Sequence, residues 1–262
     1  MTQFTIATFN ANSIRARLEQ ILDWLAREQV DVLCVQETKV QDPDFPRDPI
    51  EAAGYRVVFA GQKAHAGVAT ISRAVPSLTQ VGFDDGIDAP RLLYTQIAGL
   101  NIINTYVPQG RELDHSEFQH KLTWFRTFRA WLEARFTPAD PVVWLGDLNV
   151  APTDIDIYDP VGLRNHVDFH PDAQAALEHV RAWGFVDVFR RHHPDEPNQY
   201  TYFDYRARNP IERNIGWRID HIWATPALAA ASTGAWIDLD ARRSDRPSDH
   251  TFLVTTFDLP EA

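Results

Sequence analysis

The chain has 262 residues and a formal net charge of −11, which argues against the indiscriminate nucleic-acid binding of strongly basic domains. Its single cysteine, Cys34, lies in an apolar run and excludes an internal disulfide, which suits a reducing compartment. No basic segment followed by an apolar one opens the sequence, and no apolar run is long enough to span a membrane. We therefore expect a cytoplasmic enzyme or binding protein that has a sizeable core and no membrane partner.

The first part of the chain predicts buried strands around an amphipathic helix. Short apolar runs indicate strands that are buried on both faces, and apolar residues recur at helical spacing between the first two runs. The predicted elements are, in chain order, a strand at 4–9, a helix capped by Asn12 and Ser13, a strand at 32–35, a proline-rich loop at 42–49, and a strand pair at 55–59 and 67–72.

The rest of the chain continues this alternation and ends in a region rich in strands. The predicted elements are a hairpin at 91–98 and 100–105, a helix that begins with an Asp114–Glu117 capping box and runs to about Arg135, a central strand from Val142, a long loop at 151–170, a helix from Pro171 to Gly184, and strands at 186–189, 199–203, 218–224, 235–239 and 251–257. This order indicates mixed rather than purely parallel sheets. We predict one α/β domain over residues 1–262, built from two packed sheets.

The central strand ends in polar residues. An unbroken apolar run from Val142 to Leu145 is followed by Asp147 and Asn149. Because side chains alternate along a strand, this carboxylate and this amide point the same way. They lie at the carboxyl end of a buried strand, where open α/β sheets tend to bind their ligands. A single motif of this kind is typical of an Asx turn, so the prediction of a site depends on the recurrence of the pattern.

Other predicted strands also carry a polar group at one end. These residues are Asn10, Glu37, Tyr106, Asp220, Asp249 and His250. Each one alone has a structural explanation as a turn residue, a solvated acid or a core aromatic, because a short motif is weak support for a function. Asp220 is harder to explain in this way, since it lies in an otherwise apolar strand and a buried carboxylate needs a partner. His250 is a natural partner, because a carboxylate holds the imidazole in acid–base triads.

The residue types at these strand ends indicate the hydrolysis of a phosphate ester. Carboxylates and amides, without clustered cysteine or histidine, favour oxygen ligation of a hard cation, Mg²⁺ or Mn²⁺. A hard cation, a His–Asp pair and a tyrosine hydroxyl together suit the attack of water on a phosphodiester.

Short motifs follow one another along nearly the whole chain. They lie at residues 8–15, 36–39, 104–110, 146–152, 203–206, 218–220 and 247–250. In content and order they resemble the exonuclease III family of DNA-repair nucleases, within the endonuclease/exonuclease/phosphatase superfamily. The resemblance implies a four-layered α/β sandwich in which two mixed sheets pack face to face between helices. It also implies a metal-dependent abasic-site endonuclease with 3′–5′ exonuclease and 3′-phosphodiesterase or phosphatase activity on duplex DNA.

The resemblance further implies roles for individual residues. Asp147 would orient or deprotonate the attacking water, and His250, held by Asp220, would bind the scissile phosphate. The implied catalytic residues are Tyr106, Asp147, Asn149, Asp220 and His250. The implied metal ligands and their neighbours are Asn10, Glu37, Asp147, Asn149, Asp249 and His250. The implied substrate-binding residues are Gln109, Asn165, Tyr202, Arg206, Trp217 and Ile219.

The substrate pocket leaves two questions open at the level of sequence. Tyr202, Trp217 and Ile219 occupy positions that wall a pocket for a flipped-out abasic sugar in such enzymes. Trp217 is equally well explained as an ordinary core residue. The loop at 156–170 lies where relatives that prefer abasic sites differ from those that trim 3′ ends, and its sequence does not choose between them.

A cluster of arginines predicts duplex binding by this acidic protein. Arg206, Arg208, Arg213 and Arg218 lie close together with a single acid, Glu212, between them. We expect a monomer that binds DNA containing abasic sites or blocked 3′ ends. Two alternatives remain: a phosphatase or phospholipase acting on small phosphoesters, and a nucleic-acid-binding regulator on an inactive nuclease scaffold. The arginines argue against the first alternative, and the presence of every site residue argues against the second.

Overall fold

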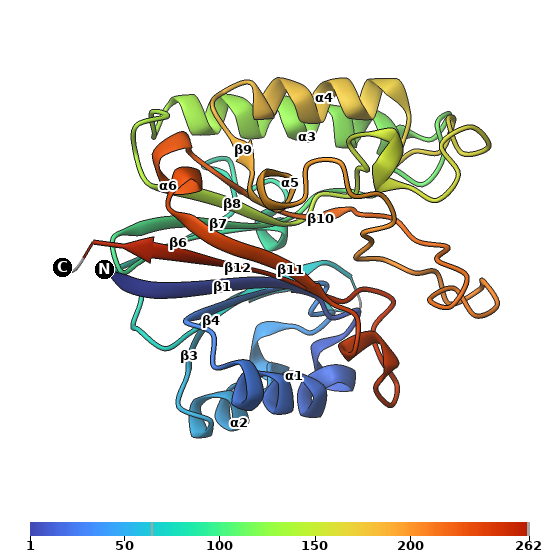
Figure 1. Cartoon of the computed structure of the whole chain (residues 1–262). Helices are drawn as coiled ribbons and strands as arrows, with labels where there is room; N and C mark the ends of the chain where they lie inside the picture. The colour runs from blue at the N-terminus through green and yellow to red at the C-terminus, as the bar shows by residue number, and fades with distance from the viewer. Residues whose placement is uncertain (64, 261–262) are drawn as a thin grey trace.

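The computed structural model describes residues 1–63 and 65–260, and it contains two β-sheets stacked between two layers of helices (Figure 1). The first sheet consists, in spatial order, of β11 (Ser232–Asp238), β12 (Phe252–Leu259), β1 (Thr2–Asn10), β2 (Val32–Gln36), β4 (Gly67–Ser72) and β3 (Arg56–Gly61). The second consists of β5 (Leu78–Val81), β6 (Leu92–Ile97), β7 (Leu100–Tyr106), β8 (Val142–Asp147), β10 (Asp220–Ala224) and β9 (Val186–Asp187). The predicted four-layered α/β sandwich is confirmed.

Helices cover the outer face of each sheet (Figure 1). The first sheet is covered by α1 (Ile14–Glu28) and α2 (Arg47–Ala52), and the second by α3 (Ser116–Glu133) and α4 (Pro171–Arg181). The short helices are α5 (Val188–His192), α6 (Pro226–Ala230), and the 3₁₀ turns η1 (Asp42–Asp44), η2 (Ala89–Arg91), η3 (Asp154–Asp156) and η4 (Ala241–Arg243). Within the described residues, we find no helix with the length and apolar character needed to cross a bilayer.

The central strands of the two sheets have the same pairing pattern. In each sheet one parallel pair, β1 with β2 or β7 with β8, is flanked by antiparallel neighbours. The carboxyl ends of these four strands therefore lie at one edge, together with the amino ends of β10 and β12. In the second sheet the register places Asp147 opposite both Tyr106 and Asp220. This shared edge brings the predicted strand-end residues together.

The sheets are held together by alternating side chains that point into the space between them. Ile6 of β1 and Cys34 of β2 pack in one cluster with Val143 of β8 and Ile222 of β10, and all four are buried. On the outer face, the Trp24 ring of α1 stacks on Phe252 of β12 at 4.0 Å. Burial of such rings contributes about 3 kcal/mol each, which ties the helix layer to the strand that leads out of the site.

Some predicted elements differ in the structure. The expected loop at 42–49 instead contains η1 and the start of α2, because proline is tolerated in the first turn, where no N–H is needed. Residues 186–189 form two strand residues followed by α5, and 199–203 forms only isolated bridges at Tyr202. Strand β5 was missed in the sequence.

The predicted helix caps are also partly wrong. Helix α1 begins after Ser13 as expected, but the Ser13 side chain makes no capping hydrogen bond. Helix α3 begins at Ser116, and its first turn is capped by His115 rather than by the predicted Asp114–Glu117 box: the Glu117 backbone N–H donates to His115 Nδ1 at 3.1 Å.

Candidate active site

A cavity of about 400 Å³ lies where the carboxyl ends of the central strands meet. The predicted site residues that line it are Glu37, Tyr106, Gln109, Asp147, Asn149, Tyr202, Arg206, Trp217, Ile219, Asp249 and His250. Two further predicted residues, Asn10 and Asp220, are fully buried and bond directly to residues of the lining. Elements from both sheets thus deliver the predicted side chains to a single hollow.

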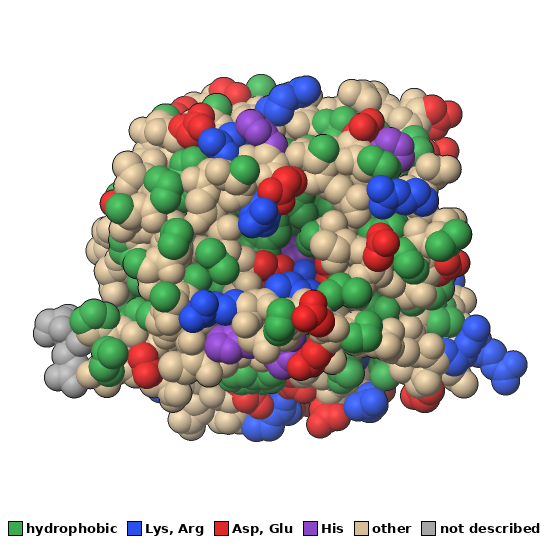
Figure 2. Space-filling view, turned by 45° about the horizontal axis from the view of Figure 1, so that its top comes forward, with side chains coloured by type: hydrophobic (Ala, Val, Ile, Leu, Met, Phe, Trp, Pro, Cys, Tyr) green, Lys and Arg blue, Asp and Glu red, His purple; other side chains and the backbone are tan. Residues whose placement is uncertain are grey.

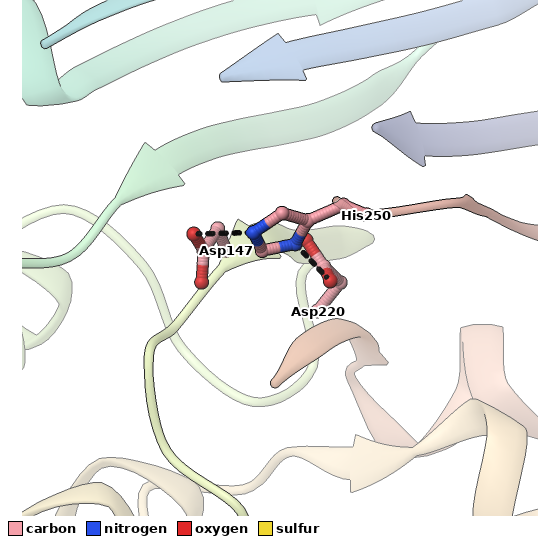
Figure 3. Close-up of side chains that lie close together, drawn as sticks. All are labelled: Asp147, Asp220 and His250. Atoms are coloured by element: carbon pink, nitrogen blue, oxygen red, sulfur yellow. Dashed lines mark hydrogen bonds and ion pairs between the residues drawn. The ribbon is translucent and has the colours of Figure 1, made fainter. Parts of the chain in front are cut away.

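The centre of the cavity is a chain of three buried side chains (Figure 3). His250 Nδ1 lies 2.8 Å from Asp220 Oδ2, and His250 Nε2 faces Asp147 Oδ2 at 3.9 Å. The predicted pairing of Asp220 with His250 is therefore present in the geometry. Asp220 Oδ1 is buried and has no hydrogen-bond partner among the described residues. One imidazole is thus shared by two buried carboxylates, one at each ring nitrogen.

These contacts change the pKa values of His250 and Asp147. Burial lowers the pKa of His250, but Asp220, Asp147 and Asp249 outweigh it and raise that pKa to about 10. Burial raises the pKa of Asp147 well above its usual range; the His250 cation opposes this rise, and the Asp220 and Glu37 carboxylates add to it. At neutral pH the imidazole is a cation suited to hold an anionic phosphate, and Asp147 is a stronger base than an ordinary aspartate.

Glu37 lines the opposite wall of the cavity and is held there by the buried Asn10. Asn10 Nδ2 donates to Glu37 Oε1 at 2.9 Å and to Asp147 Oδ2 at 2.8 Å, so one amide links the ends of β1, β2 and β8. Lys39 Nζ lies 2.6 Å from Glu37 Oε2. Burial raises the pKa of Glu37, but Lys39, Asn10 and His250 outweigh it and hold that pKa below its usual value. Glu37 is therefore ionised and open to the cavity.

Asp249 is the second carboxylate on this wall. Its Oδ1 accepts a hydrogen bond from Asn12 Nδ2 at 3.0 Å and lies 3.3 Å from Ser248 Oγ. Ser248 Oγ donates to the Asn10 carbonyl at 2.7 Å, which fixes the start of β12 against the end of β1. Glu37 and Asp249 thus present carboxylate oxygens from segments of one sheet.

The backbone conformation at the end of β8 aims Asp147 and Asn149. Gly146 has φ +133°, and a Cβ there would lie 2.0 Å from the Thr105 carbonyl oxygen, so glycine is required where β7 and β8 approach. Asn149 has φ +51°, its N–H donates to Asp147 Oδ1 at 3.0 Å, and its side chain donates to the Val107 carbonyl at 2.9 Å. The strand itself ends at Asp147, so turn geometry, not strand alternation, directs Asn149 to the cavity.

An aromatic and apolar wall completes the cavity. Trp217 and Ile219 line it and also pack with Ile157 and Phe169 of the long loop. Trp217 is thus both a wall of the pocket and a core residue, so the two interpretations of the sequence are compatible. The Tyr202 ring lies 4.9 Å from the His250 ring.

Two predicted positions differ from the expectation. Asn165 is exposed and does not line the cavity; its neighbour His166 does, with its ring 4.6 Å from that of Trp217. Arg218 is no part of a basic surface, because its side chain is 1% exposed and pairs with Asp156 and Asp187.

The structure also adds residues that the sequence did not indicate. Arg111, His166, Asp168 and Asp204 line the cavity, and each comes from a loop. Loops carry no strand-end pattern, so that pattern could not have found them, although Asp204 lies within the recognised motif at 203–206. Lys39, which pairs with Glu37, lies within one of the recognised motifs, and its charge just past the end of β2 was the only hint.

The donor set fits a hard metal ion. Asp147, Asp220 and His250 offer ligand atoms within 4.8 Å of one another. In this group His250 Nδ1 is engaged by Asp220, and a protonated imidazole cannot be a ligand. The oxygens of Glu37 and Asp249 are better placed, because carboxylates that face a cavity are the ligands that Mg²⁺ and Mn²⁺ prefer.

A larger hollow of about 600 Å³ lies between α4 and α5, where Figure 2 shows acidic and basic side chains beneath a hydrophobic wall. Its charged floor includes Asp156, Asp187, Arg190 and Arg218, and these groups pair with one another. It is larger than the first cavity, but the charges of this floor neutralise one another, so the hollow offers no evident chemistry.

Comparison with known proteins agrees with this geometry. Residues 7–250 match the model of the endonuclease/exonuclease/phosphatase family. The chain belongs to this family. It is 34% identical to exodeoxyribonuclease III of Haemophilus influenzae over 95% of this chain and 98% of that protein. The match confirms the predicted family and the predicted enzyme class, a nuclease.

Two solved structures are similar over 98% of this chain and the whole of the matched chain. An AP endonuclease from Archaeoglobus fulgidus superimposes with a TM-score of 0.96 at 44% identity. A 3′ phosphatase from Neisseria, bound to a product DNA hairpin, has a TM-score of 0.92 at 34% identity. These similarities extend to the layers and sheets described above.

Proposed function

We propose that residues 1–262 act as one catalytic domain that hydrolyses phosphodiesters of duplex DNA at abasic sites and also processes blocked 3′ ends. The observation that carries this proposal is the buried chain Asp220–His250–Asp147, which faces the Glu37 carboxylate across one cavity. The names of the similar proteins, an AP endonuclease and a 3′ phosphatase bound to DNA, support the substrate class. We further propose that the enzyme is a monomer.

Mg²⁺, or Mn²⁺ in its place, is the proposed cofactor. Glu37 and Asp249 would hold the ion, with Asn10 fixing Glu37. When bound, such an ion neutralises phosphate charge and stabilises the leaving oxygen. The remaining steps fall to side chains of this chain.

The residues divide the hydrolysis between them. Asp147 orients a water molecule and takes its proton as the water oxygen attacks phosphorus, a role favoured by its raised pKa. The bond from phosphorus to the 3′ oxygen then breaks and this oxygen takes up a proton from solvent, so that a 3′ hydroxyl and a 5′ phosphate are formed. His250, kept cationic by Asp220, and the Asn149 side chain hold the charge that develops on the phosphate oxygens.

Tyr106 stays protonated in this site. Burial, with the Glu37 and Asp147 carboxylates, raises the pKa of its phenol well above the usual value. It therefore donates a hydrogen bond to the phosphate. Tyr202, Trp217 and Ile219 form the wall against which an extruded sugar packs, and Gln109 and Arg206 contact the substrate from the rim.

One assay tests the proposal and its alternatives. A duplex with a single abasic analogue and a matched duplex with a 3′ phosphate are incubated with the enzyme and Mg²⁺ or EDTA. We expect metal-dependent cleavage of the first duplex, release of phosphate from the second, and no reaction with Asp147→Asn. Hydrolysis of small phosphoesters without cleavage of either duplex would favour the phosphatase alternative, and binding without any hydrolysis would favour the inactive regulator.

A further inference from the structure

Lys121 of α3 is a fully buried cation that lies just behind the cavity. The three N–H groups of its Nζ are shared among four acceptors: the carbonyls of Gln109 at 3.1 Å, Asn149 at 2.6 Å and Val167 at 3.1 Å, and Asp168 Oδ1 at 2.8 Å. An apolar side chain of this length would avoid the cost of burying an ammonium. The charge therefore has a use that packing alone does not explain.

The acceptors belong to three stretches of chain, and each stretch carries a residue of the cavity lining. Gln109 follows β7, Asn149 follows β8, and Asp168 lies near the end of the long loop before α4. Asp168 Oδ2 also accepts from the Gln109 side chain at 3.1 Å, so the Gln109 loop is held through both its main chain and its side chain. One ammonium thus sets the relative positions of these loops.

The fit between this lysine and the first loop is close. Gly110 has φ +102°, and a Cβ there would lie 3.4 Å from Lys121 Cδ and 3.3 Å from the Phe118 ring. The loop therefore packs on the stem of Lys121. Burial lowers the pKa of Lys121, while the Asp168 and Asp147 carboxylates counter that change.

We propose that Lys121 is a positioning residue for the reaction: it holds Asn149 in place against the scissile phosphate and holds Gln109 with Asp168 as the facing wall. This inference rests on the proposed function, because the phosphate is the ligand that these loops would meet. Lys121 thus has two sets of contacts, one with Asn149 and one with Gln109 and Asp168, which we call its two branches. The Asn149 branch acts on the transition state, and the Gln109–Asp168 branch acts on substrate binding.

Two variants separate the branches. Lys121→Met keeps the length of the side chain but removes every donor, and we expect kcat to fall about 10- to 100-fold and KM to rise. Asp168→Asn leaves the ammonium on its three carbonyls, and we expect KM to rise several-fold while kcat stays within about 3-fold. Both are measured on the abasic duplex, with kcat normalised to the folded fraction.

Leu132→Ala is the matched control for lost stability. Leu132 is a fully buried residue of the same helix and belongs to the core against α4, so its loss lowers Tm without touching the loops. We expect this control to keep the wild-type kcat and KM at a temperature where it is folded. If Leu132→Ala and Lys121→Met lose the same activity for the same fall in Tm, the proposal is overturned.

Coupling to Asn149 is the decisive measurement. If Lys121 acts through Asn149, adding Lys121→Met to Asn149→Ala lowers kcat far less than it does in the wild type. Multiplicative losses, or wild-type kinetics for Lys121→Met, would overturn the inference. If Lys121→Met does not fold, the kinetics of Asp168→Asn decide instead. A fall in kcat as large as the rise in KM would then overturn the inference. Failure of the proposed function is distinct, because the wild-type enzyme would then leave the abasic duplex intact.

Discussion

Two clusters of charged side chains meet at the segment from Arg218 to Asp220. They differ in whether each charge has a partner of opposite sign. In one, Asp156 Oδ1 accepts from Arg190 at 2.6 Å and from Arg218 at 2.7 Å, and Arg218 also pairs with Asp187 at 2.9 Å. Burial raises the pKa of Asp156, but Arg218 and Arg190 outweigh it and hold that pKa below its usual range. Every charge in this cluster has a partner of opposite sign.

The other cluster contains Asp220, two residues after Arg218, and its charges are not matched in number. Asp220 and Asp147 share the single cation His250, Asp220 Oδ1 has no partner among the described residues, and the pKa of Asp147 is raised by burial. The balanced cluster lies under the larger cavity and the unbalanced one under the smaller. Unmatched charge, rather than cavity size, therefore distinguishes the reactive site from the scaffold.

The largest effect is expected from removing the shared cation of the unbalanced cluster. His250→Ala should lower kcat by about 10³- to 10⁴-fold, because the phosphate loses the buried cation that holds its developing charge. If Asp220 acts only through His250, the double variant with Asp220→Asn should be scarcely slower than His250→Ala. Single-turnover cleavage of the abasic duplex measures both, and fully multiplicative losses would separate the two residues.

The pH dependence of Asp220→Asn tests the same pair. The His250 pKa of about 10 lies above the ordinary 6.5, so the imidazole is cationic through neutral pH and loses its proton as pH rises through about 10. The stability that it contributes is fully present below about 6.5 and is lost as pH rises from there through about 10. Removing the Asp220 charge lowers this pKa, so turnover of the variant should fall at a lower pH than in the wild type. A pH–rate profile with an unchanged alkaline limb would leave Asp220 a structural carboxylate.

The balanced cluster should respond in stability instead of rate. Arg218→Met removes the guanidinium that pairs with Asp187 and leaves Asp156 with one partner fewer, which should lower the free energy of unfolding by about 3–5 kcal/mol. The folded variant should keep kcat within about 3-fold. Urea denaturation measures the first effect, with Arg206→Met as an exposed control that should leave stability unchanged, since its pair with Asp204 is screened by solvent. A large loss of kcat with normal stability would make the two clusters alike.

Glu37→Gln should raise the Mg²⁺ concentration needed for half-maximal rate by at least about 10-fold, because a hard cation loses a charged oxygen ligand. The fold should be unaffected, since Asn10 can still bond the side-chain oxygen. A metal titration of cleavage measures the shift. Normal cutting at the wild-type metal concentration would show that Glu37 is not the ligand.

The smallest effect concerns exposed arginines, in contrast to the buried Arg218. Replacing Arg206, Arg208 and Arg213 by glutamine should weaken duplex binding and reduce its salt dependence by about one unit of slope for each phosphate that is no longer neutralised. Arg56→Gln is the matched control, because Arg56 is exposed at the opposite edge of the first sheet. Equal changes in the control would move the DNA-binding face elsewhere.

Much of the site was predictable because it is built on strand ends. The apolar run from Val142 and the polar residues after it placed Asp147, and the apolar surroundings of Asp220 called for a partner that His250 provides at 2.8 Å. Arg218 was assigned wrongly to a basic surface, because a sequence run does not reveal which arginine meets Asp156 from a distant loop. The exposure of Asn165 could not be foreseen, because irregular loops have no periodicity that fixes side-chain direction.

Local apolar periodicity was enough to predict two packed sheets, their central strands and the polar residues at the strand ends, because it specifies buried strands and where they end. The four layers were predicted only through the resemblance to a known family. Tertiary structure alone decided how these groups interact. The balance of charge around His250, the burial of Arg218 and the contacts of Lys121 each join segments far apart in the chain. Such contacts depend on the register of two stacked sheets and the loops between them, and no local pattern encodes that register.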